Sequence, residues 1–103
     1  MRFQDLLAYK KSFGLAMKIF EVSKSFPKEE KYSLTDQVRR SSRSTTANIS
    51  ESYRKRRYPK NFISKLTDSD AENSETQTWL EFAFECKYIN QVHLMIYLRT
   101  AKR

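Results

Sequence analysis

The fold is decided by residues 32–60, which read YSLTDQVRRSSRSTTANISESYRKRRYPK. Most of this stretch carries side chains that recur at three- and four-residue steps, as expected for one face of an α-helix. The face is apolar at its ends and small and hydroxylated in its middle, and it consists of Leu34, Val38, Ser41, Ser42, Thr45, Ile49 and Tyr53. Small side chains let a neighbouring backbone come near, so we predict a helix packed closely against another. The alternative is an exposed face rich in Ser and Thr.

Local signals set the ends of this helix. Ser33 to Asp36 resembles a capping box with Asp in place of the usual Glu, which predicts Ser33 as the N-cap. Residues 53–58 then form a turn, and Pro59 suits the first position of the next helix, where a backbone N–H is not needed.

The next helix is predicted from Pro59 to about Cys86. Its stripe has a polar centre between apolar neighbours and consists of Phe62, Leu66, Ser69, Asn73, Thr76, Leu80, Ala83 and Phe84. Because the turn before it is short, the two helices are predicted to be antiparallel neighbours.

Two further helices flank this pair. Residues 3–24 are predicted to form the first, with an apolar face made of Leu6, Tyr9, Phe13, Ala16, Met17 and Phe20, and Phe26-Pro27 follows its end. Asn90 is predicted to cap a last helix of about nine residues, whose apolar side is supplied by Val92, Leu94, Met95, Ile96 and Leu98. The sequence therefore predicts an all-α fold in a single domain, residues 1–103.

Charge is distributed in two blocks. The chain has a formal net charge of +8, and residues 39–60 hold +7 of it, because eight basic residues face the single acid Glu51. Residues 68–85 carry six acids and no Lys or Arg. A basic surface of this kind attracts polyanions, although many small basic proteins bind nothing specific.

The antiparallel arrangement divides the basic block into two parts. Its helical part, consisting of Arg39, Arg40 and Arg43, falls level with about residues 69–73. We therefore predict ion pairs, within the chain or across a subunit contact, to an acidic set of Asp68, Asp70, Glu72 and Glu75.

The part in the turn has no acidic block level with it. This basic turn consists of Arg54, Lys55, Arg56, Arg57 and Lys60 and is the candidate site for RNA or DNA backbone, the alternative being a solvated turn. Tyr53 and Tyr58 flank it and are candidates for stacking on unpaired bases, although burial at the end of a bundle explains them equally well.

The residues of catalytic and metal sites are scarce. His93 is the sole histidine, Gly14 is the sole glycine, and no Glu-x-x-His pair of the kind used in helical di-iron sites occurs. We predict no enzyme activity, no metal and no cofactor. Cys86, the single cysteine, is predicted to be a small buried hydrophobic residue in a reduced, cytoplasmic protein. No apolar run is long enough to span a membrane.

Several segments follow one another in an order that resembles a known family. They are residues 3–6, 26–30, 32–41, 48–51 and 72–77, and together they are similar to the 23S rRNA intervening-sequence protein family of bacterial four-helix bundle proteins. The family's Gln-x-Arg-Arg segment falls on Gln37, Arg39 and Arg40, and its Asn-Ile-Ala-Glu-Gly segment falls on residues 48–52. The chain departs from the family pattern at Thr46 (usually Pro), Ser52 (usually Gly), residues 70–71 (often Lys-Gly) and Lys87 (often Gly).

The resemblance implies an up-down antiparallel four-helix bundle, here with a short fourth helix, that assembles as a homopentamer. Family members are encoded inside rRNA genes or beside diversity-generating retroelements. In the second setting the relative partners a reverse transcriptase and contacts nucleic acid through a basic surface.

Three functional hypotheses follow. The leading one is a non-catalytic oligomeric bundle that binds RNA or DNA backbone through the basic turn. The second is a scaffold whose basic surface docks an acidic protein partner, such as a retroelement reverse transcriptase. The third is a purely structural assembly.

Overall fold

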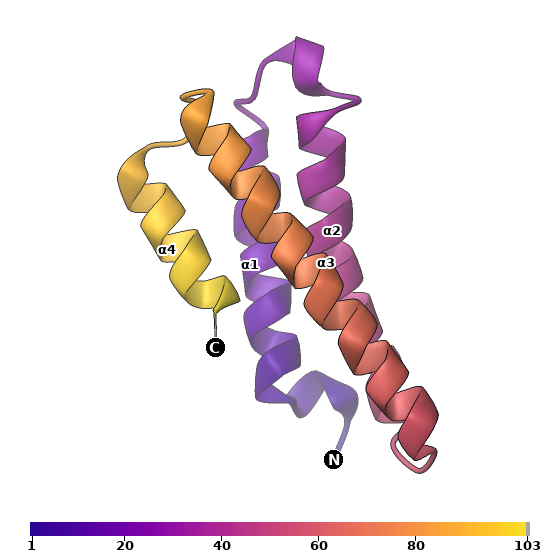
Figure 1. The fold of residues 1–103 in the computed structure, drawn as a ribbon. Coiled ribbons are helices and arrows are strands. Elements are labelled where there is room, and N and C mark those ends of the chain that lie inside the picture. The colour runs from indigo at the N-terminus through magenta and orange to yellow at the C-terminus, as the bar shows by residue number, and fades with distance from the viewer. Residues whose placement is uncertain (103) are drawn as a thin grey trace.

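The computed structural model describes residues 1–102 and shows four α-helices with no strand in that range. The helices are α1 (Leu7–Ser23), α2 (Leu34–Arg54), α3 (Pro59–Glu85) and α4 (Gln91–Ala101), with short 3-10 segments at Phe3–Asp5 and Lys28–Glu30. Consecutive helices run in opposite directions, and α4 is the shortest (Figure 1). The prediction of an all-α, up-down four-helix bundle with a short last helix is confirmed.

Among the helices of residues 1–102, α2 and α3 share the most extensive contact, and the side chains that face each other there are small. Ser41, Thr45, Ser69 and Thr76 are all buried there. The Thr76 hydroxyl donates a 2.8 Å hydrogen bond to Ser41 Oγ, and the Ser69 hydroxyl donates a 2.9 Å bond to the Thr45 carbonyl. Buried hydroxyls with partners avoid the desolvation penalty of unpaired polar groups. The predicted close packing is confirmed, and the alternative of an exposed face is wrong.

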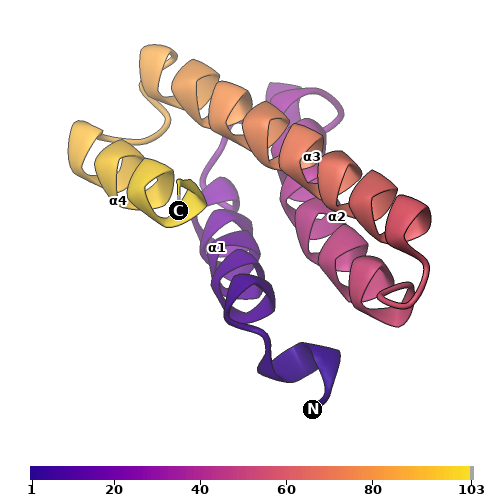
Figure 2. The ribbon, with the colours of Figure 1, turned by 60° about the horizontal axis from the view of Figure 1, so that its bottom comes forward.

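The hydrophobic core lies at the end of the bundle away from the α2–α3 turn. There, side chains from α1, α4, the first half of α2 and the second half of α3 form one cluster, which includes Leu15, Ile19, Val38, Leu80, Ala83, Leu94 and Tyr97. Toward the α2–α3 turn the interior becomes small and polar. The two long helices therefore continue beyond the core as a hairpin (Figures 1 and 2).

The predicted face of the first helix is partly wrong. Phe13 and Met17 are 50% and 48% exposed, while Leu15 and Ile19, which lie outside the predicted face, are buried in the core. α1 is apolar on more than one side, so periodicity alone does not choose between overlapping stripes. The helix also begins at Leu7 and not at Phe3, because Leu6 has an extended backbone after the 3-10 segment.

The predicted side of the last helix is likewise partly wrong. α4 begins after Asn90, whose side chain accepts a 2.8 Å hydrogen bond from the His93 backbone N–H, so the predicted cap is confirmed. The buried residues of α4, however, are Leu94, Tyr97 and Ala101. The remaining members of the predicted apolar side are half-buried or exposed, and these are Val92, Met95, Ile96 and Leu98.

Ser33 is the N-cap residue of α2, as predicted, but the predicted capping box is wrong, because the Ser33 hydroxyl donates a hydrogen bond to the Glu30 carboxylate. The Leu34 backbone N–H, the first of α2, donates to that same carboxylate. The prediction that Cys86 is buried is also wrong. Cys86 is exposed, because it is the C-cap residue of α3, beyond the last core position of that helix.

Candidate nucleic-acid interface

The basic turn lies at the tip of the α2–α3 hairpin. Local backbone hydrogen bonds close it: the Lys55 N–H donates to the Ser52 carbonyl at 3.0 Å, and the Tyr58 N–H donates to the Lys55 carbonyl at 2.9 Å. Pro59 then opens α3, as predicted. All five basic side chains of the turn are exposed. The tip points away from α4 and from the hydrophobic core (Figures 1 and 2).

Contacts with the N-terminal segment hold Tyr53 in place. Its hydroxyl donates a hydrogen bond to the Met1 carbonyl, and the Arg56 guanidinium lies 4.2 Å from its ring centroid. Arg56 also donates a 2.9 Å bond to the Tyr53 carbonyl, which satisfies an acceptor at the end of α2. Tyr58, by contrast, is 65% exposed. Of the two candidate stacking residues, Tyr58 has an exposed ring, whereas the ring and hydroxyl of Tyr53 are already engaged by Arg56 and Met1.

The only acid of the basic block is neutralised from outside the block. The Glu51 carboxylate lies 2.9 Å from the Lys65 ammonium of α3. Their hydrogen bond and charge attraction raise the Lys65 pKa. Within residues 1–102, none of the five turn side chains is within salt-bridge distance of a carboxylate. The tip therefore presents five positive charges without a counter-charge from the described chain.

The helical arginines do not pair with the acidic set in one chain. The Arg39 guanidinium donates to Ser23 Oγ at 2.7 Å and to the Phe20 carbonyl at 3.4 Å, and it lies 4.8 Å from the Phe20 ring centroid. The Arg43 guanidinium is 5.6 Å from the same ring. Both side chains thus point toward α1. Arg39 and Arg43 are level with the acids of α3 along the helix axis, but they lie on the side of α2 that faces α1. The predicted ion pairs within the chain are therefore wrong.

The predicted ion pairs between subunits stay a prediction, because the structure contains one chain. Arg40 and Arg43 are exposed on α2, and Asp68, Asp70 and Glu75 are exposed on α3. Glu72 is half-buried. These side chains are accessible to a second copy.

The sequence analysis did not predict the ion pair of Lys65 with Glu51 or the contacts of residues 1–3 with the hairpin tip. The antiparallel register that places residues 39–43 beside 69–73 also places Glu51 a few residues from Lys65. The same register could therefore have predicted this ion pair. The contact of Arg54 with the Phe3 ring, at 5.8 Å, joins segments far apart in the chain and had no local signal.

None of the helices in residues 1–102 has the length and apolar character needed to cross a membrane. Over the same residues, no three His, Cys, Asp or Glu side chains gather closely enough to hold a metal ion.

Comparison with known proteins identifies the family. A sequence profile for the 23S rRNA-intervening sequence protein family matches residues 4–102. A crystal structure of a protein of unknown function from the S23 ribosomal protein family of Bacteroides thetaiotaomicron VPI-5482 superimposes with a TM-score of 0.82 at 28% sequence identity, covering 92% of this chain and 85% of that one. No curated protein matches the chain. Because the profile covers nearly the whole sequence and the same fold recurs, this chain belongs to the 23S rRNA-intervening sequence protein family.

Proposed function

We propose that the protein is a non-catalytic, oligomeric helical bundle that binds the phosphate backbone of RNA or DNA through its basic turn. One observation carries the proposal: five exposed cations share the tip of a hairpin, and the single acid of residues 39–60, Glu51, already pairs with Lys65. Lysine and arginine that contact phosphates release condensed counterions, so affinity falls as salt rises. The tip offers charge without an element shaped to read base edges, so we expect little sequence preference.

Tyr58 adds a stacking surface to the charge. Its exposed ring is next to Arg57 in the turn, and stacking of a base on an aromatic ring contributes about 1–3 kcal/mol in single-stranded complexes. Tyr53 has no such role in this proposal, because Arg56 covers one ring face and Met1 engages the hydroxyl. We therefore expect single-stranded nucleic acid to bind more tightly than a duplex.

The test uses only turn residues without structural contacts of their own. Lys55, Arg57 and Lys60 fit this requirement, whereas Arg54 and Arg56 contact aromatic rings. Labelled single-stranded RNA and DNA are titrated at several salt concentrations against wild type and the triple change of these residues to Gln. A matched control changes Lys10, Lys18 and Lys28 to Gln, which removes the same charge elsewhere on the surface.

The turn variant is expected to lose at least tenfold in affinity. The slope of log affinity against log salt should fall by about 2, since each lost phosphate contact contributes about 0.7 on single strands. The control should change little. Equal losses in the two variants, or no binding by wild type at low salt, would contradict the proposal.

We further propose that the bundle self-associates through the outer face of α1 and α2. There Phe13 and Met17 are half exposed beside Tyr9, Arg43 and Ala47, and together they line a groove of about 360 Å³. Exposed apolar surface beside basic residues suits a second copy, whose α3 carries exposed acids. The family resemblance implies five copies, and repetition of the basic turn would strengthen weak phosphate contacts by multivalency.

Light scattering tests this interface. Changing Arg40 and Arg43 together to Glu removes the complementary charge without touching Arg39, so the mass should fall while helicity is kept. Adding Asp70→Lys and Glu75→Lys to the same chain should restore the mass, because the charges are then exchanged. An unaltered mass in the arginine variant would exclude these residues from the interface.

A further inference from the structure

One side of α3 carries acids in its first half and large aromatic side chains in its second half. The residues of this side recur at steps of four and three, which places them in one row along the helix. All of them are exposed or half-buried. We call this row the acidic–aromatic stripe, and it consists of Asp68, Glu72, Glu75, Trp79, Phe82 and the C-cap residue Cys86.

The aromatic half of the stripe forms one wall of a groove of about 400 Å³. The start of α2 and the residue before its N-cap form the opposite wall, with Leu34 and Tyr32. Phe82 is 53% exposed and Tyr32 is 86% exposed, so much of the ring surface in this groove faces solvent. Exposed apolar surface with a polar rim is typical of an interaction site.

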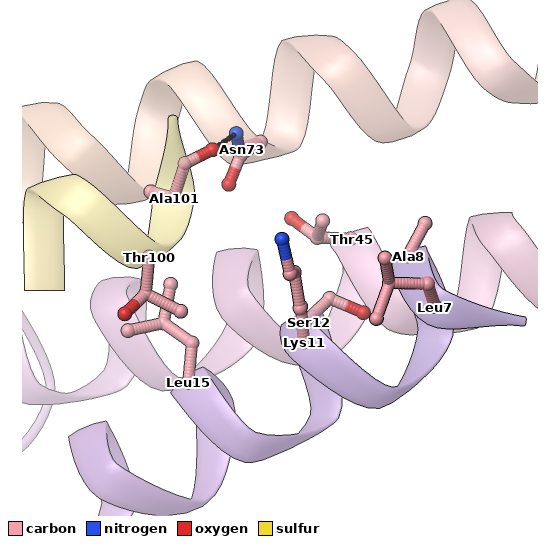
Figure 3. Close-up of a pocket in the computed structure, with 9 residues that line it drawn as sticks. All are labelled: Leu7, Ala8, Lys11, Ser12, Leu15, Thr45, Asn73, Thr100 and Ala101. Carbon is pink, nitrogen blue, oxygen red and sulfur yellow. Dashed lines mark hydrogen bonds between the residues drawn. The ribbon is translucent and has the colours of Figure 1, made fainter. Parts of the chain in front are cut away.

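The fourth helix does not cover the stripe, because it packs on another side of α3. The Asn73 amide donates a 2.8 Å hydrogen bond to the Ala101 carbonyl at the end of α4 (Figure 3). Helical geometry places Asn73 on a different side of α3 from the stripe. Within residues 1–102, the three acids of the stripe are also beyond salt-bridge distance of any Lys or Arg. The stripe therefore presents uncovered rings beside carboxylates without a counter-charge from the described chain.

The charge of the stripe limits what can cover it. Three carboxylates repel phosphate, so a nucleic acid does not fit, whereas a surface that is both apolar and basic is complementary. The outer face of α1 and α2 has this combination, since Phe13 and Met17 are half exposed there beside Arg43. That face and the aromatic groove share no lining residue. The two surfaces are therefore separate on one chain, and their contact requires a second copy.

We infer that the acidic–aromatic stripe of one copy receives the outer face of α1 and α2 of the next copy, with Phe13 and Met17 in the groove beside Trp79 and Phe82. This contact rests on the proposed self-association and names the surface that the second copy contributes to it. Two different surfaces meet, so the contact is heterologous. A pair of copies leaves one surface of each kind free, and further copies add until a ring closes.

Thiol cross-linking tests which surfaces meet, because Cys86 is the single cysteine and lines the aromatic groove. Ala47→Cys places a thiol on the outer face of α1 and α2 and keeps Phe13 and Met17, since Ala47 is exposed and lines the groove of that face. The Ala47→Cys, Cys86→Ser protein is mixed with wild type and treated with a short bis-maleimide. The matched control is Lys18→Cys, Cys86→Ser, because Lys18 is exposed on α1 and does not line that groove.

The mixture of Ala47→Cys, Cys86→Ser protein with wild type is expected to give covalent heterodimers, and either protein alone should give no covalent dimer. The Lys18→Cys control should give none with wild type. Covalent dimers of the Ala47→Cys, Cys86→Ser protein alone would mean that two α1–α2 faces meet. Covalent dimers of wild type alone would mean that two grooves meet. Either result, or equal heterodimer yields from Ala47→Cys and Lys18→Cys, overturns the inference.

Two further measurements separate this contact from self-association in general. Light scattering detects any association, whereas the fluorescence of Trp79, the single tryptophan, reports on the groove. Its emission should move to shorter wavelength as the mass rises with protein concentration. Phe82→Ser should raise the concentration for half-association about tenfold, as expected for an aromatic anchor. Ile63→Ser, which changes an exposed apolar residue of α3 outside the stripe, should behave like wild type.

Circular dichroism confirms that each variant is folded. A rise in mass with unchanged Trp79 emission, or equal effects of Phe82→Ser and Ile63→Ser, would overturn the assignment of the groove and leave the proposed self-association standing. A wild-type protein that stays a monomer at every concentration would overturn both.

Discussion

The carboxylate of Glu51 on α2 lies 2.9 Å from the ammonium of Lys65 on α3, about one helical turn before the basic turn begins. This pair joins the two long helices where the hydrophobic core no longer reaches. The pair also neutralises Glu51, the only acid among residues 39–60, with a lysine that lies outside that range. The five basic residues of the turn therefore keep their full positive charge, because Lys65 and not the turn pairs with Glu51.

Replacing Glu51 by Gln should strengthen nucleic-acid binding. The change frees Lys65 and adds one positive charge beside the turn, while the pKa of Lys65 moves back toward its ordinary value. We expect severalfold higher affinity for single-stranded RNA at low salt and a salt slope steeper by about 0.7. Glu21→Gln, which frees Lys24 at a distant i,i+3 pair, is the matched control and should leave affinity unchanged. Equal gains in both variants would show that only net charge matters.

Arg39→Ala should destabilise the bundle by about 2 kcal/mol. The change removes charge-assisted hydrogen bonds to Ser23 and to the Phe20 carbonyl, together with a cation–π contact to the Phe20 ring. Urea unfolding followed by circular dichroism measures the loss. Arg99→Ala is the control, since Arg99 is exposed on α4, and it should stay within about 0.5 kcal/mol of wild type. A similar loss in both variants would contradict the structural role of Arg39.

Lys87→Gly should stabilise the protein by about 1 kcal/mol. Lys87 has φ 65°, a left-handed conformation that glycine adopts without the steric cost borne by other residues. Its N–H donates to the Phe84 carbonyl at 2.9 Å, and the Tyr88 N–H donates to the Ala83 carbonyl at 2.8 Å, which together form a Schellman motif at the end of α3. Lys87→Ala keeps the Cβ and should give no such gain. A gain from Ala equal to that from Gly would assign the effect to the side chain.

The hydrogen bond between Tyr88 and Glu30 should make stability depend on pH at both extremes. The Tyr88 hydroxyl donates to the Glu30 carboxylate at 2.9 Å. The hydrogen bond from Ser33 lowers the Glu30 pKa most, and the bond from Tyr88 lowers it further. The stabilisation from these bonds is therefore fully present above pH 4.5 and is lost as pH falls through the pKa that Glu30 has in the folded protein. The bond to Glu30 raises the Tyr88 pKa to about 12, so that contribution is present below pH 10 and is lost as pH rises toward 12.

Urea unfolding, measured from acid to pH 12, gives the free energy of unfolding at both pH extremes. Tyr88→Phe should be less stable than wild type at neutral pH, and the difference should shrink as pH rises from 10 to 12. Glu30→Gln should reduce the loss of stability in acid. A pH-independent difference between Tyr88→Phe and wild type would mean that the ring, and not the hydroxyl, supplies the stability.

The elements were predictable where their signals are local. The helix from Pro59 to Glu85, the start at Asn90 and the small-residue face of α2 all follow from spacing and caps within a few residues of chain. The face of α1 was not predictable in this way, because its apolar residues form overlapping stripes. Only contact with α2 and α4 selects Leu15 and Ile19 over Phe13 and Met17.

The basic turn was also predictable, since five basic residues between two helices have no acids level with them. The direction of Arg39 was not, because register fixes height along a helix and leaves open which side a residue faces. The α1 carbonyl and hydroxyl that bind Arg39 come from residues far away in the chain.

The sequence by itself determined four helices, their order, the small interior between α2 and α3 and the charge of the turn. These properties depend on periodicity, capping and composition, which act over a few residues. The tertiary structure alone decided that the Glu30 carboxylate accepts the Leu34 N–H, that Lys65 neutralises Glu51 and that α4 packs on a side of α3 away from the acidic–aromatic stripe. Each of these depends on where helices cross and stop relative to one another, which packing fixes and no single segment encodes.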